Sequence, residues 1–343
     1  MSNEMKTAAP ASATGLFSHE MKTAAPASAT GLFSHEIDVS VVVMTFNRPA
    51  SLRRCLYSLA GQSFARERFE VVVVDGSHIP VHDVIKDFSG ILRIRHLVGP
   101  NLGPAGQRNC GVAEARGHWV AFTDDDCVAR PQWLEQLVMA ISHNPGVIVG
   151  GGVENVDGEN ACAVAGQVIT EVVLAFFNPV NGEATFFPGL NFILERRDYL
   201  NMGGCDARFG LIASEDRDFM DRWRARGGRL VACSVAVVRH EHRTSLSGFI
   251  RQYFNYGRGA WRYHRLRRHR GGGMGAETRL HGRLTHLLRE PLNRLSAGMR
   301  WRVLLLVGVW EVANLVGFVW QAVGESTGIL TQGKGVPVPG GRE

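Results

Sequence analysis

The sequence WVAFTDDDC, residues 119–127, carries four apolar residues, one threonine and three aspartates before its cysteine. The apolar residues predict a buried strand that ends in Asp124, Asp125 and Asp126. Three carboxylates this close together resist ionising at once, because like charges raise one another's pKa. A divalent cation relieves the repulsion, and carboxylate oxygens suit Mg²⁺ or Mn²⁺. The alternative is a solvated acidic turn ahead of a helix that is expected after Pro131, since aspartate is also common in turns and at helix N-termini.

The chain before these aspartates alternates short strands with amphipathic helices. Residues 39–44 form a valine-rich run of the kind found in strands buried on both faces, which implies a parallel sheet. Residues 51–60 follow, with leucines at the spacing of one helical face. Because this order repeats, the sequence predicts an α/β fold with a doubly wound, mostly parallel sheet. The predicted strands are residues 39–44, 69–74, 92–97 and 119–122, and the predicted helices between them are residues 51–60, 81–88 and 105–115.

Polar residues follow several of the predicted strands. Ligands of such sheets bind at the carboxyl ends of the strands, so we expect Asn47, Asp75 and the three aspartates to line one cleft. The chain has no G-x-x-x-x-G-K-[ST] motif and no G-x-G-x-x-G after its first strand, which disfavours a P-loop NTPase and a dinucleotide-dependent oxidoreductase. The glycine-rich residues 101–106 precede the helix that carries Arg108. They form either an anion site at a helix N-terminus or a plain loop-helix junction.

A second acidic site, Glu215 and Asp216, lies at the start of a predicted helix, since Phe219 and Trp223 follow at helical spacing. Two interpretations stay open. Carboxylates in a first turn are favoured by the helix dipole alone. Alternatively, one of them is a general base that removes a proton from an incoming hydroxyl group.

A predicted strand over residues 230–238 runs toward His240 and His242, and alternation along the chain places both side chains on the same side. A histidine at the end of a strand is either structural or, beside an acidic site, a metal ligand. The chain has no H-E-x-x-H motif, which excludes a zincin.

Composition and repeats limit the class of protein. The 343 residues are 45% hydrophobic, which predicts a globular chain of one large or two ordinary domains. Six scattered cysteines without a C-x-x-C pair disfavour a zinc ribbon or a disulfide framework and favour reduced thiols in a cytosolic protein. Residues 5–20 and 21–36 are identical, but two polar copies cannot build a solenoid, and they lack the apolar core of a signal peptide. We therefore interpret residues 1–36 as a disordered leader made by duplication.

The C-terminal third is basic and then apolar. Residues 258–302 contain twelve arginines and only two glutamates, which suits an anionic surface such as nucleic acid or a membrane. Residues 303–323 are apolar apart from glycines and Glu311, Asn314 and Gln321, which share one narrow helical face. This pattern suits an in-plane membrane anchor or a helix packed on a partner, and a buried core helix stays open. We expect peripheral or monotopic association with the cytoplasmic face of the cell membrane, and we disfavour nucleic acid as a partner.

Five motifs, in their order along the chain, resemble those of the family 2 glycosyltransferases of GT-A fold. They are VSVVVMTFNR at 39–48, VVVDGS at 72–77, NLG at 101–103, FTDDD at 122–126 and ED at 215–216. The likeness covers about residues 37–262. It implies a Rossmann-like GT-A domain there, between the leader and a C-terminal extension over residues 263–343. It also implies an inverting transfer of a sugar from a nucleotide-diphosphate donor, most often uridine-based in this family, to a hydroxyl acceptor.

The resemblance also implies roles for single residues. Asp126, the last carboxylate of a D-x-D-like element, and His240 would bind Mg²⁺ or Mn²⁺, with His242 as a second candidate. Asp216 matches the catalytic base, and Glu215 belongs to the same catalytic element. The residues implied to bind the nucleotide sugar are Thr45, Asn47, Arg48, Asp75, Arg108, Asp124, Asp125 and Asn191.

Two departures from the family pattern limit the detail. Gly76 follows Asp75 where many members carry a second acidic residue, so the contacts to the base and ribose are less defined. Gln252 is present, but the Arg-Trp pair of the processive Q-x-x-R-W motif is missing at that spacing, which favours addition of single sugars. With the basic region and the apolar segment, we expect a lipid-linked or cell-envelope glycan as acceptor. The alternatives are a sugar-nucleotide pyrophosphorylase and a catalytically inactive membrane or nucleic-acid adaptor.

Overall fold

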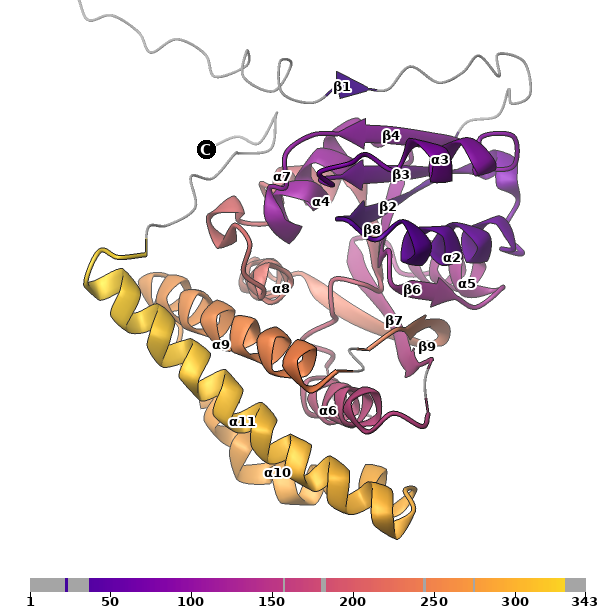
Figure 1. Cartoon of the computed structure of the whole chain (residues 1–343). Helices are drawn as coiled ribbons and strands as arrows, with labels where there is room; N and C mark the ends of the chain where they lie inside the picture. The colour runs from indigo at the N-terminus through magenta and orange to yellow at the C-terminus, as the bar shows by residue number, and fades with distance from the viewer. Residues whose placement is uncertain are drawn as a thin grey trace, which may run out of the picture.

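A computed structural model describes residues 22–23, 37–156, 158–179, 183–242, 245–273 and 275–330. The elements form one mixed β-sheet with helices on both faces and a group of long C-terminal helices on one side (Figure 1). The predicted leader lies outside the described residues, apart from strand β1 (Lys22–Thr23), which pairs with β4.

The first half of the sheet is parallel, as the alternation predicts. Strands β4, β3, β2 and β5 lie side by side in this order, and each pair is parallel. Their bounds are β2 Val39–Thr45, β3 Phe69–Asp75, β4 Ile94–Val98 and β5 Trp119–Asp124, and the intervening helices are α2 Pro49–Ala60, α3 His82–Phe88 and α4 Gly103–Glu114. Each predicted element is therefore present, with ends within a few residues of the prediction.

The second half of the sheet adds antiparallel pairs. Strand β8 (Phe192–Glu195) lies antiparallel between β5 and β7 (Val147–Asn155), and β9 (Arg229–His240) is parallel to β7. Strand β6 (Cys127–Ala129) pairs antiparallel with the end of β9. The helices of this half are α5 Trp133–Ser142, α6 Ala161–Phe177, α7 Arg196–Asn201 and α8 Glu215–Ala225, and short 3₁₀ turns occur at Arg66–Arg68 and Ala207–Phe209. The predicted α/β fold class is confirmed.

Strand register brings the polar strand ends together. Thr45 pairs with Asp75 across β2 and β3, and Met44 pairs with Asp124 across β2 and β5. Cys127 pairs with His240 across β6 and β9, so the residue after Asp126 lies opposite the histidine at the end of β9. Residues more than 100 positions apart in the chain thus meet at one edge of the sheet.

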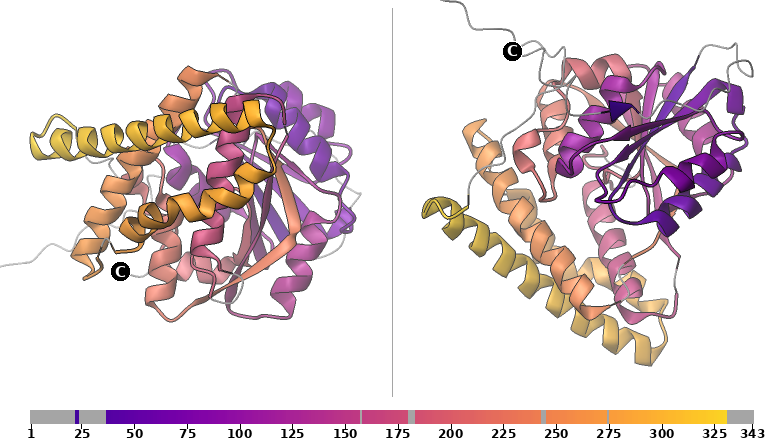
Figure 2. Two further views of the ribbon diagram at one scale, coloured as in Figure 1. Left: turned by 90° about the horizontal axis from the view of Figure 1, so that it is seen from below. Right: turned by 45° about the horizontal axis from the view of Figure 1, so that its top comes forward.

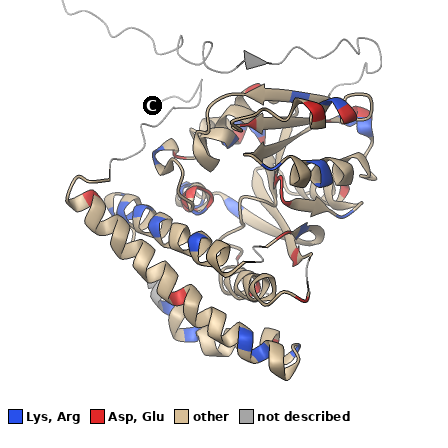
Figure 3. Cartoon of the chain, viewed as in Figure 1, with Lys and Arg blue, Asp and Glu red and all other residues tan. Residues whose placement is uncertain are grey.

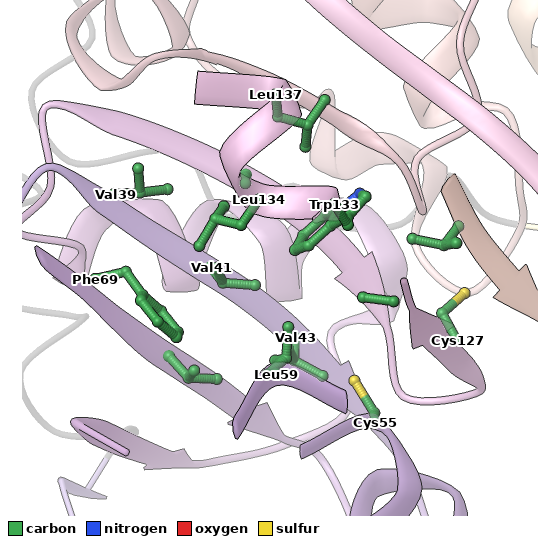
Figure 4. Packing of buried hydrophobic residues seen from close by; sticks show 14 of the residues in the cluster. Val39, Val41, Val43, Cys55, Leu59, Phe69, Cys127, Trp133, Leu134 and Leu137 are labelled. Atoms are coloured by element: carbon green, nitrogen blue, oxygen red, sulfur yellow. The ribbon is translucent and has the colours of Figure 1, made fainter. Parts of the chain in front are cut away.

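Two apolar cores enclose the sheet because successive side chains of a strand point to opposite faces. On one face, Val39, Val41 and Val43 of β2 pack with Leu59 of α2 and Trp133 of α5 (Figure 4). On the other face, the alternate valines of β2 and β3 pack on α4, α7 and α8. Each fully buried aliphatic or aromatic side chain contributes about 1.5–3 kcal/mol. Together these cores fix the strands whose ends carry the polar residues.

A third core joins the C-terminal helices to α6. Helices α9 (Leu246–His269), α10 (Gly275–Asn293) and α11 (Ala297–Ser326) gather on one side of the molecule, and α9 lies between α8 and α11 (Figures 1 and 2). Apolar residues of α6, α9, α10 and α11 form one buried cluster. The boundary predicted at residue 262 falls inside α9, which is continuous through it.

The predicted apolar segment is the central part of α11, and its polar residues face the protein. Gln321 is buried and accepts a hydrogen bond from Arg258 Nε (2.9 Å). Glu311 pairs with His281 of α10 at 2.9 Å. The polar residues of α11 thus contact α9 and α10 of the same chain. Apolar residues occur on both sides of the helix, since Val303 and Leu306 are buried in the third core whereas Leu305 and Val316 are exposed.

Candidate active site

Arg48 and Thr45 hold two of the three aspartates. Arg48 lies in the turn between β2 and α2 and pairs with Asp126 and, at 2.7 Å, with Asp125 Oδ1. Thr45 Oγ1 donates to Asp125 Oδ2 (2.8 Å). Asp125 is fully buried, and burial raises its pKa to about 7 despite the nearby Arg48. Burial therefore favours the neutral form of this carboxyl group more strongly than Arg48 favours the charged form.

Arg108 links the triplet to the second acidic site. Its guanidinium pairs with Glu215 at the start of α8 and lies 3.5 Å from Asp124 Oδ1. Burial alone would lower the pKa of Arg108, but Glu215 and Asp124 raise it above its usual value. Burial raises the pKa of Asp124, and its Oδ1 accepts no hydrogen bond from any described residue. Asp124 thus retains capacity for a cation or a hydroxyl donor.

Asp216 lies beside Glu215 but in a different environment. Its Oδ2 accepts a hydrogen bond from Gly189 N (2.8 Å), and its Oδ1 accepts one from Arg217 N (2.7 Å). Ser214, which precedes the helix, has a φ of 81°, a strained conformation of the kind that occurs at functional sites. Glu215 is buried against Arg108, whereas Asp216 is only partly buried. Of the two residues, Asp216 is the one that a substrate can reach.

His240 lies against the last aspartate of the triplet, with Nε2 3.5 Å from Asp126 Oδ1. The ring of His242 is 4.4 Å from that of His240, so the expected common side is observed. His242 is buried, its pKa falls to about 3 because of burial and the neighbouring His240, and its Nε2 lies 3.2 Å from Gln167 Oε1. Its hydrogen bond to Gln167 leaves His240 as the better metal ligand.

Few side chains that could bind a metal ion lie close to Asp126 and His240. In the part of the chain that the structure describes, no group of three or more His, Cys, Asp or Glu residues could surround one metal ion. One carboxylate and one imidazole still fit Mg²⁺ or Mn²⁺, which often take one or two protein ligands and complete their shell with substrate phosphates and water. The donor set therefore fits a cation that binds together with a nucleotide.

Asn47 and Asp75 organise the neighbouring loop. Asn47 is exposed with a φ of 55°, and its Oδ1 accepts from His78 N (3.0 Å). Asp75 is buried and accepts hydrogen bonds from Ser77 N (2.9 Å), Val81 N (2.9 Å) and His96 Nε2 (3.0 Å). Its carboxylate is therefore already engaged with protein groups at the edge of the cleft.

Asn191 lies in the core rather than in the cleft. It is fully buried, its Nδ2 donates to Gly152 O (2.7 Å) and Ala236 O (3.0 Å), and its Oδ1 accepts from Trp133 Nε1 (2.8 Å). The structure does not bring this side chain together with the other predicted site residues. It ties β7, β9 and α5 to the loop before β8.

A cavity of about 790 Å³ lies beside several of the predicted site residues. Six residues predicted from the sequence line it, namely Arg108, Asp124, Glu215, Asp216, His240 and His242. Further walls come from α6, α9, α10 and α11, which the sequence analysis did not connect with the site.

Sequence reasoning also missed Gly189 and Arg217. A Cβ atom on Gly189 would lie 2.2 Å from Arg108 Nη2, so only glycine fits between Arg108 and Asp216. The guanidinium of Arg217 lies over the rings of Phe177 (4.9 Å) and Tyr263 (4.7 Å). The sequence offers a weak signal for Gly189, because this glycine follows a proline just before a predicted site residue. It offers no signal for Arg217.

An open α/β sheet with acidic residues at its strand ends, facing a carboxylate on a separate helix, is the GT-A fold of nucleotide-sugar-dependent transferases. The Glycosyl transferase family 2 model matches residues 40–213, and the chain belongs to this family. Membership of a glycosyltransferase family disfavours the pyrophosphorylase.

Relatives and solved structures agree with this class. The chain is 32% identical over 226 residues to the pre-mycofactocin glycosyltransferase of Mycobacterium tuberculosis, which covers 64% of this chain and 46% of that protein. It is 30% identical over 218 residues to the validoxylamine A glucosyltransferase of Streptomyces hygroscopicus, and this match covers 55% of this chain and 52% of that protein. The chain thus spans about half the length of these curated relatives.

A mannosyltransferase from Pyrobaculum calidifontis, PcManGT, solved in complex with GDP-Man and Mn²⁺, superposes with a TM-score of 0.55. The match covers 87% of this chain and 82% of that one at 16% identity. At this identity the likeness shows the shared fold.

Proposed function

We propose that the chain is a metal-dependent, inverting glycosyltransferase that moves a single sugar from a nucleotide-diphosphate donor to a hydroxyl acceptor. The observation that carries the proposal is the position of Asp216. It is held by Gly189 N (2.8 Å) and Arg217 N (2.7 Å) and lines the cavity that also contains Asp124, Arg108 and His240. A base and a donor site share one cavity in this arrangement.

The donor end of the cavity is the cluster around the aspartate triplet. Asp124 accepts a hydroxyl group of the ribose, buried Asp125 holds Thr45 and Arg48 in place, and Thr45, Asn47 and Arg48 lie at the nucleotide end. Asp75 keeps this loop in place through its hydrogen bonds to Ser77 and Val81. Arg108, charged and buried beside Asp124, faces the diphosphate. We expect a uridine nucleotide, as is common in the family.

Asp126 and His240 would hold Mg²⁺ or Mn²⁺, and the bound cation would neutralise charge on the departing diphosphate. The clustering of three carboxylates supports this role, because burial raises the pKa of Asp124 and Asp125 and a bound cation would favour their charged forms. The Mn²⁺ complex of the mannosyltransferase of the same fold is consistent with it.

Asp216 removes the proton of the acceptor hydroxyl as its oxygen bonds to the anomeric carbon. The bond from that carbon to the diphosphate oxygen breaks in the same step, so the nucleoside diphosphate leaves and the configuration at the carbon is inverted. No protein nucleophile is required. Glu215 has a different task, because its ion pair with Arg108 fixes the guanidinium near Asp124.

The acceptor and the location follow from the C-terminal helices. Of the described helices, only α11 is long and apolar enough to cross a membrane, and 28% of its most apolar stretch is buried inside the protein. Its outward face is apolar, and arginines lie on α9, on α10 and at the start of α11 (Figure 3). Exposed arginines contribute roughly 1 kcal/mol each at an anionic leaflet. These features support our proposal that the enzyme is a peripheral or monotopic protein at the cytoplasmic face of the cell membrane, with a lipid-linked or envelope glycan as acceptor.

Replacement of Asp216 by asparagine tests the catalytic assignment. Asparagine keeps the size and an acceptor for Gly189 N but removes the base, so sugar transfer should fall by about 10²- to 10⁴-fold while nucleotide binding is retained. Radiolabelled sugar transfer and calorimetric nucleotide binding measure the two effects. Asp87→Asn, at an exposed carboxylate of α3, is the matched control. Transfer at the wild-type rate by Asp216→Asn would place the base elsewhere.

Thermal unfolding with nucleotide sugars tests the donor and the metal. A donor at 100 times its Kd should stabilise the chain by about 2.7 kcal/mol. We expect the shift only with Mn²⁺ or Mg²⁺ present, and its loss on addition of EDTA. The variants Asp126→Asn and His240→Ala should lose the metal-dependent part. A full shift in EDTA would contradict the metal requirement.

A further inference from the structure

The catalytic cavity has a second, apolar arm. At one end, Asp124, Arg108 and Asp216 line it. Toward the C-terminal helices its walls are Ile169, Val173 and Phe177 of α6, Tyr253 of α9, and Trp310 and Phe318 of α11. These residues belong to helices that pack against the α/β domain without supplying any group to the proposed donor site.

The apolar arm is continuous with the outer surface of the molecule. Val312 and Leu315 of α11 line the cavity, yet they are 62% and 64% exposed. They belong to a row of exposed apolar residues along α11 whose other members are Leu305, Val316, Val319, Trp320 and Val323. The cavity therefore opens on the face that the proposed function places against the membrane.

The helix-helix contacts keep this opening in place. Gly317 of α11 and Gly257 of α9 let the two backbones meet, since a Cβ on either residue would lie 2.0 Å from a carbonyl oxygen of the other helix. The volume of about 790 Å³ is within the range of pockets that enclose most of a drug-sized ligand. It has room for a sugar headgroup and part of a hydrocarbon chain.

We propose that the apolar arm binds the hydrocarbon chain of a lipid acceptor, which enters from the bilayer past Val312 and Leu315 and presents its headgroup hydroxyl to Asp216. This inference rests on the proposed function and adds the class of acceptor and its route. The occupant is a single chain, isoprenoid or acyl, because residues of α6, α9, α10 and α11 bound the arm. Arg279, Arg283 and Arg289 of α10 are exposed and available to an anionic headgroup.

Binding of n-alkyl glucosides to the full chain tests this site without any donor. Hexyl, octyl and decyl β-glucoside are titrated by calorimetry below the concentrations at which they form micelles. A methylene that becomes fully buried tightens Kd by about fourfold. We expect decyl glucoside to bind at least tenfold more tightly than hexyl glucoside. Equal affinity across the series, with nucleotide and Mn²⁺ binding intact, would overturn the proposal.

Two pairs of variants test where the hydrocarbon chain of the ligand binds. Val173→Trp fills the arm and should remove the dependence on chain length, whereas Ala175→Trp, at an exposed position of the same helix, should not. Leu315→Gln, at the opening of the cavity, should weaken the binding of decyl glucoside severalfold. Val319→Gln changes an exposed residue of the same face that does not line the cavity, and it should leave Kd unchanged. Equal weakening by both glutamine variants would mean binding to the outer face alone and would overturn the proposal.

Binding of a nucleoside diphosphate and Mn²⁺ is measured on each variant. Retained binding shows that the variant is folded, and it tests the transferase function separately from the lipid site. Chain-length dependence without nucleotide binding by the wild type would refute the transferase assignment. Competition by farnesyl phosphate against competition by a short-chain diacylglycerol then distinguishes an isoprenoid acceptor from an acyl acceptor. Failure of both to compete with decyl glucoside would count against a lipid acceptor.

Discussion

Gly189 places two charged residues of the site at once. Its N–H donates to Asp216 Oδ2 (2.8 Å), and the space where a Cβ would stand is filled by the guanidinium of Arg108. Arg108 is itself held by Glu215 and lies 3.5 Å from Asp124. The spacing between the proposed base and the proposed diphosphate ligand therefore depends on one residue without a side chain.

We predict that Gly189→Ala lowers the rate of sugar transfer at least tenfold, about 1.4 kcal/mol in the barrier, because the methyl group displaces Arg108 or Asp216. Steady-state kinetics measure the change, and the far-ultraviolet circular dichroism spectrum should be unchanged. Gly90→Ala is the control, since a Cβ there meets no atom within 4 Å. Wild-type kinetics for Gly189→Ala would show that Arg108 does not need its present position.

Glu325, near the C-terminal end of α11, joins that helix to α9 and to the loop before α8. Its buried carboxylate accepts from Arg262 Nη2 (2.8 Å) and pairs with Arg265. Arg262 Nη1 also donates to Arg208 O (2.5 Å) in the 3₁₀ turn that precedes the catalytic helix. One carboxylate thus connects the helix proposed to touch the membrane with the segment that carries Asp216.

We predict that Glu325→Gln destabilises the chain by about 3 kcal/mol, because Arg262 is left buried without its counter-ion. Urea unfolding measures the loss. Glu311→Gln, at a carboxylate about a third exposed and paired with His281, should cost at most about 1 kcal/mol and serves as control.

The ionisation of Glu325 makes the stability difference between wild type and Glu325→Gln depend on pH. Burial raises the pKa of Glu325, but hydrogen bonds from Gln321, Arg262 and Arg265 outweigh it and lower the pKa from 4.5 to about 2. A folded-state pKa below the unfolded value stabilises the fold above the unfolded pKa. The stability difference between wild type and Glu325→Gln should therefore be complete above pH 4.5 and shrink as the pH falls toward 2. A difference that grows on acidification would refute this assignment.

At the scale of the whole molecule, the outward face of α11 determines where the enzyme works. The row of exposed apolar residues on α11 has no partner among the described residues, whereas the polar residues of the helix contact α9 and α10. A helix that carries a long row of exposed apolar residues suits a lipid surface better than water.

We predict that Leu305→Arg combined with Val316→Arg releases the protein from anionic lipid vesicles, because two charges would enter the apolar layer. Cosedimentation measures the bound fraction, and Asn293→Arg, at an exposed position of α10, controls for added charge. Deleting residues 300–343 is a less specific test, since Val303, Leu306 and Trp310 belong to the third core. Unchanged cosedimentation of the double variant would argue against a membrane face.

The sequence by itself determined the fold class and most of the polar cleft. Valine-rich strands alternating with amphipathic helices specify a parallel α/β sheet through local periodicity, and polar residues directly after strands must lie at one edge of it. Asn47, Asp75 and Asp124 to Asp126 could be placed in this way because their positions depend on the strands that precede them, whereas Thr45, Arg48 and the role of Asp216 came from the resemblance to a family.

Only the tertiary structure decided what depends on contacts between distant segments. Asn191 lies in the core because β7, β9 and α5 surround it, and Glu215 differs from Asp216 because Arg108 of α4 reaches only the first of them. The polar stripe of α11 faces inward because α9 and α10 supply its partners. The apolar arm of the cavity exists only where α6, α9 and α11 meet. Local periodicity assigns a residue to a face of its own element, but the packing of elements decides what that face touches.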